Sequence, residues 1–178
     1  MRIVSGKYGG RRLHPPASLP VRPTTDFAKE SLFNILNNMV DYEELSVLEL
    51  FAGTGSISFE FVSRGCPSVT AVDQDGRCVS FIIKTCQEFK IDKLRAYRSE
   101  AFFFVKRATG KYNLIFADPP YDMPSLAQLP DKILEKGLLK PQGLLIIEHP
   151  RNNDFSKHPA FMQHRVYGKV NFSFFTAP

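Results

Sequence analysis

The sequence contains no tryptophan and only three cysteines, although 16 of its 178 residues are phenylalanine. The cysteines (Cys66, Cys78 and Cys86) form no C-x-x-C pair and show no metal-ligand spacing. This pattern excludes a disulfide framework and favours a reducing, cytoplasmic location. A chain of this length buries enough apolar surface to need no disulfide or metal for stability, and we expect no metal site.

Long apolar segments are also missing. No apolar run reaches the roughly 18 residues that span a bilayer, so we expect no membrane-spanning helix. The first residues, "MRIVSGKYGGRRL", lack the apolar stretch of a signal peptide. The composition, 43% hydrophobic and 23% charged, is that of a soluble globular protein, which we expect to be a monomer.

Negative charge is absent from the N-terminal segment. Five cationic residues precede Asp26, and no acidic residue does: Arg2, Lys7, Arg11, Arg12 and Arg22. With a net charge of +5, this distribution indicates a polyanionic partner such as nucleic acid, the alternative being a solvated terminus. We expect residues 1–23 to form a basic arm with a short hairpin through Gly9-Gly10, and residues 24–178 to form one domain.

From residue 46 onward, short apolar strands alternate with helices. The expected strands are 46–51, 68–73, 94–99, 112–118 and 143–149, followed by two that meet at Gly168. The first expected helix begins at Thr25 or Asp26, and the others cover residues 55–65, 77–91, 101–108 and 126–139. This alternation predicts an α/β fold whose parallel sheet is covered by helices on both faces. Because such sheets bind ligands at the carboxyl ends of their strands, the residues there are the candidates for a site.

The first strand end carries the loop "LELFAGTGSIS". Gly53 and Gly55 let the backbone approach a ligand closely, and the following helix supplies N–H donors. Ser58 stands where a dinucleotide fingerprint has a third Gly or Ala, and Glu49 would repel a pyrophosphate. The loop therefore suits a cofactor with a cationic or amine-bearing part.

Acidic residues follow the second and third strands. Asp73 lies 20 residues beyond the glycine-rich loop, where an acid can hold the ribose hydroxyls of an adenosyl cofactor, and Asp75 competes for this role. Glu100 can accept a hydrogen bond from an adenine amino group, with Ala101 and Phe102 beside the ring. Taken alone, each acid is more typical of an ordinary exposed strand end than of a cofactor site.

The fourth strand runs into Asp118-Pro119-Pro120-Tyr121. An exocyclic base amine is a poor nucleophile because its lone pair is delocalised into the ring. A carboxylate and the Pro119 carbonyl can accept its two N–H groups and orient the nitrogen, while the prolines fix the backbone. Tyr121 can stack on a flipped-out base. The loop predicts an amine clamp, the alternative being a stiff loop with a buried tyrosine.

Together, "LELFAGTGSISFE", "VDQD", "RSEAF" and "DPPYD" resemble the class I S-adenosylmethionine-dependent methyltransferases of the N/DPPY type, which modify exocyclic amines. Upstream, "RIVSGKYGGRRLHPP" and "VRPTTDFAKESLFNIL" are similar to the RsmD family, as is the ending "YGKVNFSFF". These bacterial enzymes methylate N2 of a guanine in small-subunit ribosomal RNA. The resemblance covers essentially the whole chain.

This resemblance implies a Rossmann-like fold, with a mostly parallel seven-stranded sheet and an antiparallel C-terminal strand. It implies S-adenosylmethionine as the cofactor and 16S rRNA or a small-subunit assembly particle as the partner. The implied cofactor contacts are Glu49, Phe51, Gly53, Gly55, Asp73, Glu100 and Ala101. The implied catalytic loop is Asp118, Pro119, Pro120 and Tyr121, and the cofactor and RNA entrance is lined by Arg22, Pro23, Thr24 and Thr25.

Two positions depart from the family pattern: Glu100 stands where the family often has Asp, and "DQD" leaves Asp73 and Asp75 as alternatives for the ribose. Three other functions fit parts of the sequence. These are an adenine-N6 methyltransferase acting on DNA or RNA, a nucleotide-dependent oxidoreductase and a non-catalytic RNA-binding factor. His149 and His158 are interpreted as structural or surface residues. Glu148, at the end of the fifth expected strand, is a further candidate for substrate contact.

Overall fold

The computed structural model describes residues 1–19, 21 and 25–177. Within this part of the chain, seven strands form one sheet in the order β3-β2-β1-β4-β5-β7-β6. The strands are β1 (Ser46–Leu50), β2 (Ser68–Asp73), β3 (Leu94–Arg98), β4 (Tyr112–Ala117), β5 (Leu139–His149), β6 (Phe161–Tyr167) and β7 (Val170–Thr176).

Strands β1 to β5 are parallel to one another, and β7 runs antiparallel to both β5 and β6. The turn between β6 and β7 contains Gly168, whose φ of 62° suits a residue without a side chain. This topology confirms the predicted mostly parallel seven-stranded sheet with an antiparallel C-terminal strand. The strand order reverses between β1 and β4, where ligands of such sheets bind.

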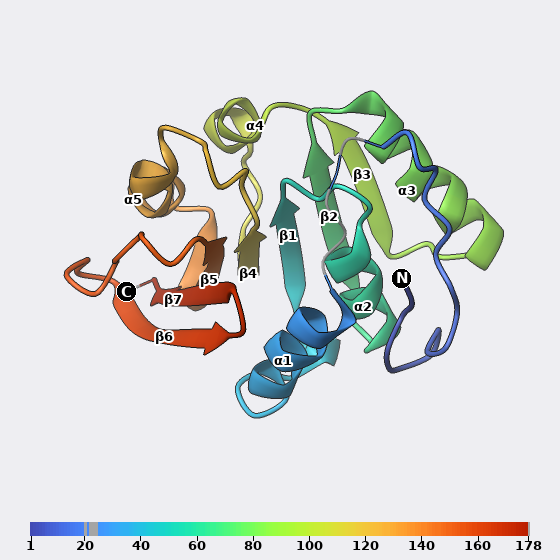
Figure 1. The fold of residues 1–178 in the computed structure, drawn as a ribbon, viewed down its shortest axis with the longest axis horizontal. Helices are drawn as coiled ribbons and strands as arrows, with labels where there is room; N and C mark the ends of the chain where they lie inside the picture. The colour runs from blue at the N-terminus through green and yellow to red at the C-terminus, as the bar shows by residue number, and fades with distance from the viewer. Residues whose placement is uncertain (20, 22–24, 178) are drawn as a thin grey trace.

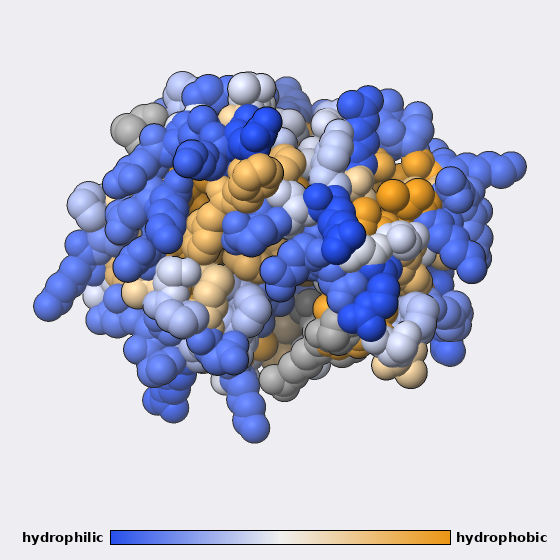
Figure 2. Space-filling view, turned by 90° about the horizontal axis from the view of Figure 1, so that it is seen from above, coloured by the Kyte–Doolittle hydropathy of each residue, from blue (hydrophilic) through white to orange (hydrophobic). Residues whose placement is uncertain are grey.

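The arrowheads of β1, β2 and β3 point to the upper edge of the molecule in Figure 1. Figure 2 looks onto this edge and shows a mainly hydrophilic surface with apolar areas between the polar side chains. The carboxyl ends of the parallel strands therefore meet on a face that is open to polar ligands.

Helices cover both faces of the sheet (Figure 1). They are α1 (Asp26–Leu36), α2 (Ser56–Ser63), α3 (Gly76–Phe89), α4 (Ala101–Arg107) and α5 (Leu129–Glu135), with short 3-10 turns at Tyr42–Glu44 and Leu126–Gln128. Thr25 caps α1 by accepting a hydrogen bond from the N–H of Ala28, which settles the alternative between Thr25 and Asp26. None of the described helices is both long and apolar enough to cross a bilayer.

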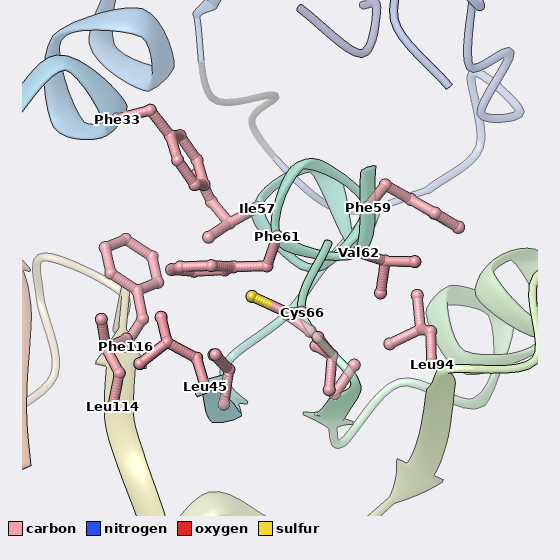
Figure 3. Close-up of a cluster of buried hydrophobic side chains, with 14 of the residues drawn as sticks. Phe33, Leu45, Ile57, Phe59, Phe61, Val62, Cys66, Leu94, Leu114 and Phe116 are labelled. Carbon is pink, nitrogen blue, oxygen red and sulfur yellow. The ribbon is translucent and has the colours of Figure 1, made fainter. Parts of the chain in front are cut away.

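The core has two layers. Helices α1, α2 and α3 pack on one face of the sheet, where Phe33 and Phe61 meet with ring centroids 4.8 Å apart (Figure 3). Helices α4 and α5 pack on the other face, around residues such as Val105 and Ile133. Each face receives alternate residues of the central strands, which explains why apolar residues stand next to one another in β1 and β4 instead of alternating with polar ones.

Strand β5 begins at Leu139, four residues before the predicted start at residue 143. Gln142 has a φ of 60°, and the pairing of β4 with β5 shifts register between Tyr112 and Leu114. The irregularity interrupts the apolar pattern, so the first part of the strand carries no strand signal in the sequence.

The N-terminal arm forms the predicted hairpin. Arg2 and Arg12 form an antiparallel bridge, and the N–H of Ile3 donates to the Arg11 carbonyl at 2.9 Å. The side chains of Ile3, Tyr8 and Leu13 are buried in the core. The arm is therefore packed against the domain rather than solvated. The predicted division of the chain at residue 23 falls outside the described residues.

Two buried charged side chains hold the arm. Glu60 of α2 accepts the N–H groups of Val4 at 2.7 Å and Ser5 at 3.0 Å, and it pairs with Arg64. The ammonium group of Lys29, which is fully buried, donates to the Arg2 carbonyl and to Ser56 Oγ. Burial lowers the pKa of Lys29, and the nearby carboxyl group of Glu60 opposes this shift.

Replacing Glu60 by alanine should destabilise the protein strongly. The Glu60→Ala change leaves two backbone N–H groups and Arg64 without their buried acceptor. We expect the free energy of unfolding to fall by about 3–5 kcal/mol, measured by urea denaturation. Glu88→Ala, which removes an exposed acid of α3, is the control and should change it by less than about 0.5 kcal/mol. Equal effects of the two changes would contradict the anchoring role of Glu60.

Candidate functional site

The carboxyl ends of the parallel strands open into a cavity of about 830 Å³. Residues that follow β1, β2, β3 and β4 all line it, and α1 contributes Ala28. The turn between β6 and β7 contributes Lys169. This is the position that the strand-end rule predicts for a ligand site.

Of the acidic residues that line the cavity, four belong to the strands or directly follow one: Glu49 (β1), Asp73 (β2), Asp118 (after β4) and Glu148 (β5). The residue two positions before each one belongs to the core layer under α1, α2 and α3. Because side chains alternate along a strand, the four acids are directed to that same face of the sheet.

Glu49 holds the first turn of α2. Its Oε2 atom accepts hydrogen bonds from the backbone N–H of Ser58 at 2.9 Å and from the Ser58 hydroxyl. Burial raises the pKa of Glu49 to about 8; the Ser58 hydrogen bonds oppose the shift and the negative charge of Asp73 adds to it. Ser58 thus has a structural reason to stand where a dinucleotide fingerprint has glycine.

The glycine-rich loop is held from its other side by Asp73. The Gly53 N–H donates to Asp73 Oδ2 at 2.7 Å, and Gly53 has a φ of 54°. Gly55 has a φ of 72°, and a Cβ atom there would lie 2.9 Å from Ile82 Cγ1. Gly55 therefore lets α2 begin against α3, and it is the one predicted cofactor residue that does not line the cavity.

Asp73 and Asp75 have different partners, although both line the cavity. Asp75 caps α3 by accepting the Arg77 N–H at 2.8 Å, and its Oδ2 atom lies 2.6 Å from the Arg77 guanidinium. The hydrogen bonds from Arg77 lower the pKa of Asp75 to about 2. Among the described residues, the Asp73 carboxyl group accepts hydrogen bonds from the backbone N–H groups of Gly53 and Asp75 only.

Glu100 caps α4. Its two carboxyl oxygens accept the N–H groups of Phe102 at 3.0 Å and Phe103 at 2.8 Å. Glu100 and Ala101 both line the cavity, and Phe102 packs against the core layer below. The acid thus has a structural role at the strand end, and its predicted contact with adenine stays a prediction.

The loop from Asp118 to Tyr121 lines the cavity next to the glycine-rich loop. The Asp118 N–H points to the Leu50 carbonyl, at 3.5 Å, which links the loop to the end of β1. Tyr121 is 42% exposed rather than buried, and its hydroxyl donates to Glu148 Oε1 at 2.9 Å. The ring is therefore accessible for stacking, as an amine clamp requires.

The predicted RNA residues are not all near the cavity. Thr25 lines it, whereas Arg22, Pro23 and Thr24 lie outside the described residues. The Arg11 guanidinium lies 4.8 Å from the ring centroid of Phe89, at the far end of α3, and the backbone of Lys7 bonds to the end of α2. These two cations lie at the opposite end of the helices from the glycine-rich loop.

Arg2 and Arg12 lie closer to the site. They line a smaller cavity of about 420 Å³ together with Asp26, next to the residue that caps α1. Arg2 also approaches Asp26 and Glu30 at 3.5 Å. The structure therefore separates the predicted basic arm into a part near the cavity and a part remote from it.

His149 and His158 have structural contacts, as predicted. His149 is buried, with Nε2 2.8 Å from Ser173 Oγ, and His158 pairs with Asp131. The sequence reasoning missed Arg98 and Lys169, which both line the cavity. The strand-end rule could have indicated Arg98, the last residue of β3. Among the described residues, no group of three or more His, Cys, Asp or Glu could hold a metal ion.

Known proteins resemble this chain over nearly its full length. Ribosomal RNA small subunit methyltransferase D of Escherichia coli is 30% identical over 173 residues, which is 96% of this chain and 86% of the relative. The protein of the same name from Haemophilus influenzae is 32% identical over 152 residues, 83% of this chain and 78% of the relative.

Solved structures show the same fold. The E. coli protein yhhF has a TM-score of 0.86 at 26% identity, covering 99% of this chain and 97% of that one. The family model described as "Conserved hypothetical protein 95" matches residues 1–176. This chain therefore belongs to that family, the RsmD family that its sequence motifs resemble.

Proposed function

We propose that the protein is an S-adenosylmethionine-dependent methyltransferase that modifies the exocyclic N2 of a guanine in small-subunit (16S) ribosomal RNA. The observation that carries the proposal is one shared cavity, which brings Asp118 and Tyr121 next to the glycine-rich loop and Asp73. The names of the family relatives, which specify small-subunit ribosomal RNA, support the substrate.

The residues of the cavity fit this cofactor. A carboxyl group has about four acceptor positions, so Asp73 can accept the two ribose hydroxyls in addition to its backbone donors. We assign the ribose to Asp73 because the Arg77 guanidinium occupies Asp75. Ala101 and Glu100 would meet the adenine, and Glu49 and the loop from Phe51 to Gly53 would lie beside the cationic part. When bound, the cofactor supplies a methyl group activated by a positively charged sulfur.

The D-P-P-Y loop would hold the base. Asp118 and the Pro119 carbonyl accept the two N–H groups of the amine, so the nitrogen lone pair is directed out of the plane of the base. The fixed φ of the two prolines keeps the carbonyl in place, and Tyr121 stacks on the ring. Catalysis then rests on positioning, and the acidic proton of the alkylated nitrogen leaves to Asp118 or to water.

The remaining parts of the proposal concern partners and location. Arg2, Arg12 and Thr25, together with Arg22 and Thr24, would contact the RNA near the entrance, with Lys7 and Arg11 on a more distant surface. The substrate would be 16S rRNA or a small-subunit assembly particle. The three cysteines are buried and form no disulfide bond, which supports a reducing, cytoplasmic location, where we propose that the protein works as a monomer.

The direct test is methyl transfer from tritiated cofactor. We expect label in small-subunit rRNA, either naked or in a partly assembled particle. Asp118→Asn should lower kcat by at least about 100-fold, because it replaces the charged carboxylate acceptor of the amine by a neutral, weaker amide, and should leave the Kd of the cofactor within about twofold. Asp122→Asn, at the next acid of the loop, is the control and should keep near wild-type turnover. Label in DNA but not in rRNA would contradict the proposal.

The raised pKa of Glu49 predicts proton release on cofactor binding. A cation beside Glu49 favours the ionised form, so at pH 7 binding should release up to about one proton, and affinity should rise with pH up to about 8. Isothermal titration calorimetry in buffers of different ionisation enthalpy measures this. The Glu49→Gln variant should release fewer protons on binding, which distinguishes protons released by Glu49 from those released by the amine of the cofactor itself. Identical release by both proteins would exclude contact between Glu49 and the cation.

The two parts of the basic arm should differ in RNA binding. Helix α3 spans about 20 Å between Gly76, at the cavity, and Phe89, beneath Arg11. Arg12→Glu should weaken binding and lower the salt slope by about one. Arg11→Glu, with the same change in charge at the adjacent residue, should have a smaller effect. Equal losses in fluorescence titrations at several salt concentrations would contradict this division.

A further inference from the structure

Glu148 lies beside the amine clamp but has no part in the transfer described above. It is 6% exposed and lines the cavity together with Asp118 and Tyr121. The parallel pairing of β4 with β5 matches Ala117 with Ile147, so Asp118 and Glu148 occupy the next position on neighbouring strands. Such strands lie about 4.8 Å apart, and Asp118 and Glu148 lie on neighbouring strands at the edge of the sheet, with both side chains directed to the same face.

The hydrogen bond from the Tyr121 hydroxyl to Glu148 Oε1 orients these groups toward one another. A base lying on the face of the Tyr121 ring would have one edge directed to Asp118 and Glu148. The carboxyl group of Glu148 has further acceptor positions besides the one that the tyrosine hydroxyl uses. It can therefore accept a hydrogen bond from the same base that Asp118 holds.

The exocyclic amines of the bases differ in what lies next to them. In guanine, the N2 amine is adjacent to N1–H, which is a hydrogen-bond donor. In adenine and cytosine, the amine is flanked on the Watson–Crick edge by a ring nitrogen with a lone pair. An acceptor placed beside the amine clamp therefore favours guanine and repels the other two bases.

We propose that Glu148 selects guanine by accepting a hydrogen bond from its N1–H, while Asp118 and the Pro119 carbonyl hold N2. This inference rests on the proposed methylation of a base amine and names the residue that chooses the base. It accounts for a selection that the D-P-P-Y loop does not make by itself, since that loop recognises only an amine. The pairing of β5 with β4 places Glu148 at this edge, next to Asp118.

The test uses 2-aminopurine, which keeps the N2 amine but has a lone pair at N1 in place of the N1–H. After the target nucleotide has been mapped, rRNA carrying either guanosine or 2-aminopurine at that position is methylated with tritiated cofactor. The wild-type protein should prefer guanosine by at least roughly 100-fold in kcat/KM, since its acceptor meets a lone pair in the analogue. Glu148→Gln, whose amide can donate to that lone pair, should reduce this preference to about tenfold or less.

Tyr121→Phe is the matched control. It removes the hydrogen bond between Tyr121 and Glu148 but leaves the ring and the carboxyl group in place. We expect it to lower kcat/KM on both substrates by a similar factor and to keep the preference for guanosine. A purely structural role of Glu148 would instead make Glu148→Gln and Tyr121→Phe behave alike.

The outcomes separate this inference from the proposed function. Methylation of guanosine with the same preference in wild type and Glu148→Gln would overturn the role of Glu148 and leave the proposed function intact. N6-methyladenosine as the product of the wild-type protein would overturn both. A loss of preference confined to Glu148→Gln would support the selection of guanine through N1–H.

Discussion

The hydrogen bonds from the first turn of α2 to the buried carboxyl group of Glu49 fix the position of the glycine-rich loop. Asp73 holds the same loop through the Gly53 N–H. Because both acids come from the ends of parallel strands, the loop is fastened directly to the sheet. The shape of the cavity, and the place of every group around it, depends on this connection. A buried carboxyl group with a raised pKa is tolerated here because its hydrogen bonds compensate part of the cost of burial.

The same use of acids recurs around the cavity. Asp75 caps α3 and Glu100 caps α4, each by accepting backbone N–H groups at the start of a helix. An acid at a strand end can therefore cap a helix and also bind a ligand, since a carboxyl group has more acceptor positions than a cap uses. Asp118 and Glu148 continue the row toward β5, where the proposed base would lie. One row of acids thus serves to build the wall of the site and to bind polar groups.

Much of the fold and most of the candidate site are encoded in local patterns. Apolar runs predicted the central strands, and the strand-end rule led to Asp73 and Asp118, which the structure brings into one cavity. Features that depend on distant contacts were not predictable. The pairing of Asp75 with Arg77, the anchoring of the arm by Glu60 and the stacking of Arg11 on Phe89 all require the packed structure. The early start of β5 was hidden because its irregular backbone breaks the apolar pattern.

The most direct test of the account is a crystal structure of the protein with S-adenosylhomocysteine and an RNA fragment containing the target guanine. The account predicts the ribose at Asp73, the adenine near Ala101 and the sulfur facing the D-P-P-Y loop. The guanine should lie on the Tyr121 ring, with N2 at Asp118 and N1 at Glu148. A cofactor bound away from the glycine-rich loop, or a base presenting a different edge to Asp118, would contradict it.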